Sequence, residues 1–69
     1  MTADNSVQNR ARSIIVVEDD SDIANLLKLE LEEAGFSVET HATGIRGLSA
    51  IRESNPDLII LDLGLPDLS

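Results

Sequence analysis

Four acidic residues stand just after short hydrophobic runs: Glu18, Asp19, Asp20 and Asp62. The first three follow Ile14–Val17, and the fourth follows Leu58–Leu61. Carboxylates gathered in a low-dielectric cleft repel one another, and a bound cation relieves that repulsion. Mg²⁺ suits such a site because it binds a few carboxylates and keeps several waters, which phosphate oxygens can displace. The pattern therefore indicates a divalent-metal site able to handle a phosphoryl group.

Asp62 is the candidate for covalent chemistry at this site. A carboxylate is a poor nucleophile towards an anionic phosphoryl group, but a metal that bridges both screens the charge. The product would be an aspartyl phosphate, a known outcome for carboxylate nucleophiles. Two plainer explanations stay open. The acids at 18–20 could serve only the dipole of a following helix, and Asp62 could simply cap a turn.

Three strands are expected to position these side chains. The unbroken apolar runs Ile14–Val17 and Leu58–Leu61 predict strands of the buried, parallel kind. The alternating segment Phe36–His41 predicts a half-exposed edge strand. Ligands of open α/β sheets bind at the carboxyl ends of the strands, so the acids would meet there if the first and third strands are neighbours.

Two helices are predicted between the strands. The first covers Asp22–Ala34, with Ser21 as its N-cap. Its inward face is expected to contain Ile23, Leu26, Leu27, Leu31 and Ala34. The second follows a Thr43 cap and stops at Asn55, since Pro56 disfavours helix there. Its expected inward stripe is Ile45, Leu48 and Ile51. The order β-α-β-α-β predicts an α/β fold with right-handed crossovers and a parallel sheet.

Composition limits the classes of partner. The 69 residues contain 13 acidic and 5 basic side chains, for a formal net charge of −8. Such a chain should attract cations and basic surfaces, and we expect it to bind no nucleic acid by itself. Cysteine is absent, and no apolar run approaches the roughly 20 residues that span a bilayer. The N-terminus does not read as a secretory signal, so the expected location is cytoplasmic, without membrane contact.

Two segments carry a family resemblance. Ile15–Asp20 and Asp57–Asp67 closely resemble the matching motifs of CheY-like receiver domains from two-component response regulators. They are most similar to the receivers of winged-helix transcriptional regulators of the OmpR/PhoB type. The resemblance implies a flavodoxin-like sheet with strand order 2-1-3-4-5. The resemblance covers residues 14–69, which we expect to form a partial receiver domain with strands 4 and 5 and helices 3 to 5 absent. Residues 1–13 are polar, and we expect them to be a disordered tail.

The resemblance implies a role for each matching residue. Asp62 corresponds to the phospho-acceptor, and Glu18 and Asp19 correspond to the acidic pair that holds Mg²⁺. Asp62 and the backbone carbonyl of Gly64 would complete the metal shell. Gly64 departs from the bulkier residue common at that place, but a carbonyl survives the change. Asp20 corresponds to an acidic neighbour that is not usually a ligand.

The implied function is signalling. A sensor histidine kinase would donate a phosphoryl group to Asp62 with the help of Mg²⁺, and full-length family members would control transcription. Such a domain is not an enzyme in the usual sense, although it catalyses its own phosphotransfer. The family's switch residues, a hydroxyl residue and a lysine after strands 4 and 5, have no counterpart in this sequence. The alternative is therefore a truncated or pseudo-receiver interaction module without phosphorylation switching.

Three further expectations come from the residues. The open apolar edge of Leu58–Leu61 favours self-association or marginal stability. Asp67 is expected to be a loop acid rather than a metal ligand. A dinucleotide-binding half-domain is disfavoured because acids, and not a glycine-rich turn, follow the first strand.

Overall fold

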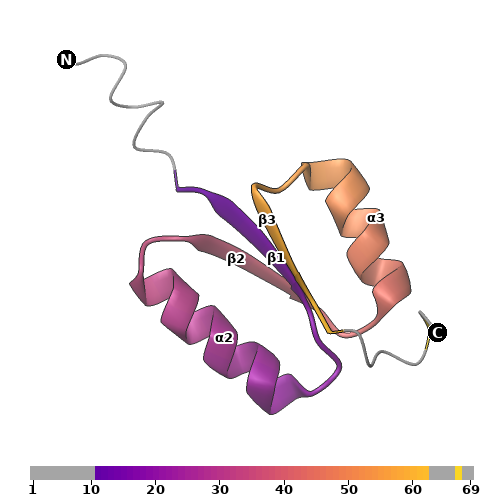
Figure 1. Ribbon diagram of the computed structural model, residues 1–69, viewed down its shortest axis with the longest axis horizontal. Coiled ribbons are helices and arrows are strands. Elements are labelled where there is room, and N and C mark those ends of the chain that lie inside the picture. Colours follow the sequence, from indigo (N-terminus) through magenta and orange to yellow (C-terminus); the bar gives the residue numbers. More distant parts are fainter. Residues whose placement is uncertain (1–10, 63–66, 68–69) are drawn as a thin grey trace.

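The computed structural model describes residues 11–62 and 67, which form a three-stranded parallel sheet with two helices (Figure 1). In chain order the elements are β1 (Ser13–Val17), α2 (Ser21–Glu33), β2 (Ser37–His41), α3 (Gly44–Ser54) and β3 (Leu58–Leu61). The strand order is β2-β1-β3, and both pairs are parallel. The predicted β-α-β-α-β arrangement is confirmed. Of the predicted tail, residues 1–10 lie outside the described residues, and Ser13 already belongs to β1.

The centre of the sheet is the hydrophobic core. Residues Ile14–Val17 of β1 are between 0% and 2% exposed, so this strand is covered on both faces as predicted. Ile14 and Val16 pack in a cluster with side chains of α2, whereas Ile15 and Val17 pack with side chains of α3. The two helices accordingly lie on opposite faces of the sheet (Figure 1). Alternate side chains of one strand thus hold both helices.

The start of α2 differs from the prediction by one residue. Asp20, and not Ser21, is the N-cap, and its Oδ1 accepts the backbone N–H groups of Asp22 and Ile23 at 2.9 and 3.2 Å. A carboxylate offers the unpaired N–H groups of a first turn both an acceptor and a negative charge. Gly35 follows the last turn with φ of 101°, as expected for a glycine after a helix.

The inward face of α2 is also rotated from the predicted one. Ala24 is buried, and Leu27 and Leu31 pack against the core as predicted. Ile23 and Leu26 are 46% and 59% exposed, so their predicted burial is wrong. Ala34, the C-cap of this helix, is exposed as well. Hydrophobic spacing alone did not distinguish the buried stripe of Ala24, Leu27 and Leu31 from the exposed stripe of Ile23 and Leu26, because side chains on either stripe recur every three or four residues.

Small residues form the inward face of α3. Gly44, Gly47 and Ala50 are buried, and Ile51 packs against the core as predicted. The predicted burial of Ile45 and Leu48 is wrong, since they are 69% and 45% exposed. The cause is the close approach of this helix to β1. A Cβ atom added at Gly47 would lie only 2.5 Å from Cγ2 of Val17.

The amino edge of the sheet is joined by backbone and side-chain hydrogen bonds. Oδ2 of Asp57, just before β3, accepts the N–H of Ser13 at 2.7 Å. The N–H of Asp57 donates in turn to the carbonyl of Ser13 at 2.9 Å. These two bonds secure the start of β3 beside the start of β1.

β3 is the less covered edge strand. Among the described residues it pairs with β1 alone, and Leu58, Ile59 and Leu61 are between 42% and 53% exposed. Ile60 is half-buried and packs on the α2 side. In the part of the chain that the structure describes, no helix has the length and hydrophobicity needed to cross a membrane.

Candidate functional site

The topology brings the carboxyl ends of β1 and β3 together. Val17 and Leu61 are partners in the parallel register, and the N–H of Asp62 donates to the carbonyl of Val17 at 3.0 Å. On the other side of β1, the N–H of Glu18 donates to the carbonyl of His41 at 3.0 Å. The residues that follow the central strand and its neighbours are therefore held at one edge by ladder hydrogen bonds.

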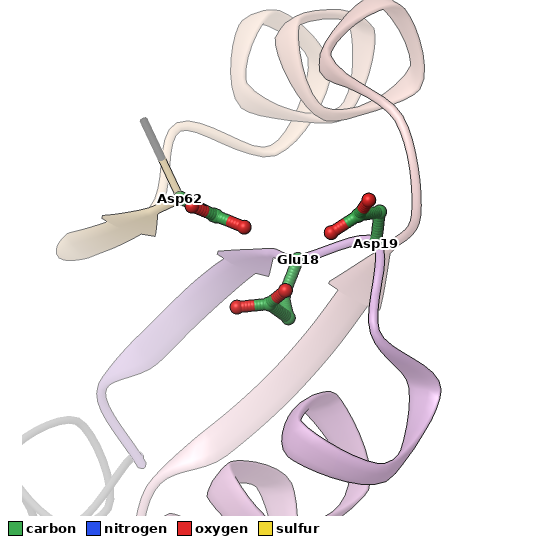
Figure 2. A group of neighbouring side chains, drawn as sticks. All are labelled: Glu18, Asp19 and Asp62. Atoms are coloured by element: carbon green, nitrogen blue, oxygen red, sulfur yellow. The ribbon is translucent and has the colours of Figure 1, made fainter. Parts of the chain in front are cut away.

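Three carboxylates converge at this edge. One oxygen from each of Glu18, Asp19 and Asp62 lies within 4.8 Å of the other two. Figure 2 shows Glu18 and Asp19 leaving the end of β1 and Asp62 leaving the end of β3, with the side chains around one shared space. Glu18 and Asp62 are half-buried, and Asp19 is exposed. The predicted gathering of these three side chains is present, whereas Gly64 lies outside the described residues.

The pKa of Glu18 reflects the repulsion among these three carboxylates. The N–H of Asp20 donates to Oε2 of Glu18 at 3.1 Å, and this bond lowers the pKa of the Glu18 carboxyl. Burial and the neighbouring side chains of Asp62 and Asp19 act in the opposite direction and outweigh it. The net result is a Glu18 pKa above its ordinary value. Protonation or a bound cation would each relieve the repulsion.

The spacing of the oxygens is compatible with a single small cation. Octahedral Mg²⁺ binds oxygens at about 2.1 Å, which places adjacent ligands about 3 Å apart and opposite ligands about 4 Å apart. One carboxylate oxygen from each of the three residues lies within 4.8 Å of the other two, which is close to these spacings. Hard carboxylate donors also match the preference of Mg²⁺. Glu18, Asp19 and Asp62 are thus the described residues that could hold the ion.

Two other acids near this edge bind backbone N–H groups. Asp20 caps α2 by accepting the N–H groups of Asp22 and Ile23. Asp67 accepts the N–H of Gly44 at Oδ1 and the N–H of Ile45 at Oδ2, both at 2.9 Å. These bonds lower the pKa of Asp67. Sequence reasoning treated Asp67 as a loop acid and missed this contact. The only sequence signal for an acid bound from elsewhere was that the first turn of α3 contains no acidic residue.

Comparisons with known proteins agree with this architecture. The family described as the response regulator receiver domain matches residues 14–69. The transcriptional regulatory proteins KdpE of Mycobacterium tuberculosis (strain ATCC 25618 / H37Rv) and AfsQ1 of Streptomyces coelicolor are 43% and 45% identical to this chain over 56 residues. The DNA-binding response regulator MtrA of Mycobacterium leprae is 41% identical over 56 residues. Each match covers 81% of this chain and 25% of the relative, so the chain spans about a quarter of these relatives' length.

Proposed function

This chain belongs to the response regulator receiver domain family, and from that membership we propose that it accepts a phosphoryl group on Asp62 from a sensor histidine kinase. The observation that carries the proposal is the placement of Asp62 beside Glu18 and Asp19, with one oxygen of each within 4.8 Å of the others. Such a transfer needs an acceptor carboxylate and a cation that screens charge, and the three carboxylates could supply the acceptor and hold the cation.

The proposed reaction is a nucleophilic displacement at phosphorus. A carboxylate oxygen of Asp62 attacks the phosphorus of a phosphohistidine in the kinase. The new P–O bond forms as the P–N bond breaks, and the imidazole leaves with the electron pair and takes up a proton. The ladder bond from the N–H of Asp62 to the carbonyl of Val17 positions the backbone of the nucleophile during this step.

Mg²⁺ is the proposed cofactor. Glu18, Asp19, Asp62 and the backbone carbonyl of Gly64 would hold it. When bound, the ion would screen the charge between carboxylate and phosphoryl group and stabilise the transferring oxygens. Glu18 and Asp19 contribute the negative charge that attracts the ion, and the raised pKa of Glu18 marks the repulsion that ion binding would relieve.

The wider role follows from the relatives. Two of them are named transcriptional regulatory proteins, and MtrA is named a DNA-binding response regulator. We therefore propose that this domain is the signalling part of a cytoplasmic protein that controls transcription, with self-catalysed phosphotransfer as its only catalysis. We do not propose that this chain itself binds DNA, because its formal net charge of −8 would repel the phosphates.

Self-association through β3 is a second part of the proposal. Leu58, Ile59 and Leu61 are between 42% and 53% exposed on a strand that pairs, among described residues, with β1 alone. Exposed apolar edge strands favour pairing with another chain. Replacing Ile59 with Lys should shift the chain from oligomer to monomer in sedimentation velocity. A monomeric wild-type chain at high concentration would rule this part out.

Phosphorylation by acetyl phosphate tests the proposed function. The wild-type chain should become labelled in the presence of Mg²⁺, lose the label in EDTA, and show no label in Asp62→Asn. Asp57→Asn is the matched control, because it changes an acid at the other end of the same strand and should still be labelled. A folded chain that neither binds Mg²⁺ nor accepts label would favour the interaction module instead.

A further inference from the structure

Asp67 connects two parts of the chain that are distant in sequence. Its two carboxylate oxygens accept the N–H groups of Gly44 and Ile45, each at 2.9 Å, and these donors are 23 and 22 residues away. A carboxylate that receives two backbone N–H bonds at a helix N-terminus is a strong, charge-assisted contact. The contact fixes Asp67 to the first turn of α3 even though the carboxylate itself is exposed.

This contact completes the capping of α3. Thr43 satisfies one further donor, because its Oγ1 accepts the N–H of Arg46 at 3.2 Å. The first turn of α3 contains no acidic residue of its own. Asp67 therefore supplies from a remote position the negative charge that helices usually carry in their first turn. Thr43 and Asp67 cap the same helix, but only Asp67 belongs to the chain that follows the acceptor.

The first turn of α3 is a fixed anchor point beside the site. Gly44 and Gly47 are buried, and Gly47 lies so close to Val17 that even a Cβ atom there would clash with it. Val17 in turn accepts the N–H of Asp62 and directly precedes Glu18. Asp62 is thus held by a ladder bond to β1, and Asp67, five residues later in the sequence, is held by cap bonds to α3, which itself packs against β1.

We propose that Asp67 is a positioning residue for phosphoryl transfer to Asp62, an inference that rests on the proposed function. Its two bonds hold residue 67 to α3, and so to the sheet, only five residues after Asp62 in the sequence. Less conformational freedom must then be lost when cation and phosphodonor bind. In this role Asp67 touches neither the attacking oxygen nor the phosphorus.

The test compares Asp67→Ala with Thr43→Ala in the full chain. Both variants remove a cap of α3, but only the first also releases residue 67 from this helix. Mg²⁺ dependence of labelling by acetyl phosphate is measured for each, with the helical circular dichroism signal as a check on folding. Asp67→Ala should raise the half-maximal Mg²⁺ concentration by about tenfold, the low end for residues that position metal ligands. Thr43→Ala should stay within about twofold of wild type.

Asp67→Asn provides a graded second variant. Its amide retains one acceptor oxygen but opposes an N–H with its own N–H₂ group, so its effect should lie between those of wild type and Asp67→Ala. Equal shifts in Asp67→Ala and Thr43→Ala would assign the effect to helix stability and overturn the inference. A wild-type chain that takes no label would instead overturn the proposed function, so the two failures can be told apart.

Discussion

Carboxylates flank β3 at both of its ends, and the fold uses them in opposite ways. At the amino end, Asp57 accepts the N–H of Ser13 at 2.7 Å and so ties two strands together. At the carboxyl end, Asp62 shares a small space with Glu18 and Asp19. The first carboxylate faces a backbone donor, whereas the second faces other carboxylates. The comparison teaches that the groups facing an acid beside a strand decide whether it stabilises the strand pairing or adds a repulsion that a cation could relieve.

The largest predicted effect is the difference in Mg²⁺ affinity between variants at the two ends of β3. Asp19→Asn removes one negative charge from the proposed site and should weaken Mg²⁺ binding by about 100-fold, since even outer-shell partners of metal sites contribute 10–100-fold. Asp57→Asn should leave the affinity unchanged. Isothermal titration calorimetry of Mg²⁺ into each variant checks this. Equal affinities for the two variants would remove the distinction between the ends.

Packing of α3 against the carboxyl end should give the next largest effect. Gly47→Ala places a Cβ atom 2.5 Å from Cγ2 of Val17, a β-branched side chain that is only 1% exposed. Overpacking of this kind costs about 1–3 kcal/mol, and the better helix propensity of Ala returns about 1 kcal/mol. The free energy of unfolding in urea should therefore fall by up to about 2 kcal/mol.

A solvent-facing position of α3 provides the control for this prediction. Ser49→Ala changes an exposed residue of the same helix and should alter stability by no more than about 0.5 kcal/mol. Because Val17 precedes Glu18, Gly47→Ala should also weaken Mg²⁺ binding, which Ser49→Ala should not. A Gly47→Ala chain that is more stable than wild type would mean that helix propensity outweighs the close contact.

Stability without metal should change in opposite directions at the two ends. Asp57→Ala loses the bond from the N–H of Ser13 and should lower the free energy of unfolding by about 1 kcal/mol. Asp19→Asn should instead raise it in EDTA, because it removes repulsion from Glu18 and Asp62. The gain should shrink as salt is added, since Asp19 is exposed and its interactions are screened. Destabilisation by both substitutions would show that the Glu18–Asp19–Asp62 group is not under strain.

The sequence predicted the topology and the gathering of the three acids well, and for a specific reason. β1 is a continuous β-branched run, and its order with two helices and two further strands allows few parallel arrangements. The inward faces of the helices were harder to predict. In α3 the buried residues are glycines and an alanine, which carry no hydrophobic signal, while Ile45 is 69% exposed. Close approach to Val17 selected that face, and such an approach depends on the tertiary structure.

The role of Asp67 could not be read from the sequence either. The cap of a helix is normally sought in the residue just before its first turn, and Thr43 satisfies that rule. The second cap comes from a residue more than twenty positions later. Asp20 shows the same limit on a smaller scale, because only the backbone geometry distinguishes it from Ser21 as the N-cap of α2.

The pH dependence of stability should give the smallest effect, and it separates two acids at the carboxyl edge. The pKa of Asp67 is lowered by the N–H groups of Gly44 and Ile45, so its contribution is present above its ordinary value of 3.8. That contribution is lost as the pH falls through the lower folded pKa. The pKa of Glu18 is raised, so its contribution is full below its ordinary value of 4.5 and is lost as the pH rises through the folded pKa.

Without metal, these two groups alone therefore favour a stability maximum between their ordinary pKa values of 3.8 and 4.5. Urea denaturation in EDTA between about pH 2.5 and 7.5 measures this maximum, because that range extends beyond both ordinary pKa values. Glu18→Gln should flatten the decline above the maximum, and Asp67→Asn should flatten the decline below it. Mg²⁺ should also reduce the decline on the neutral side, because the ion favours ionised Glu18. If Glu18→Gln leaves that side unchanged, then repulsion within the acidic group does not govern stability there, and the contrast with Asp57 would rest on metal binding alone.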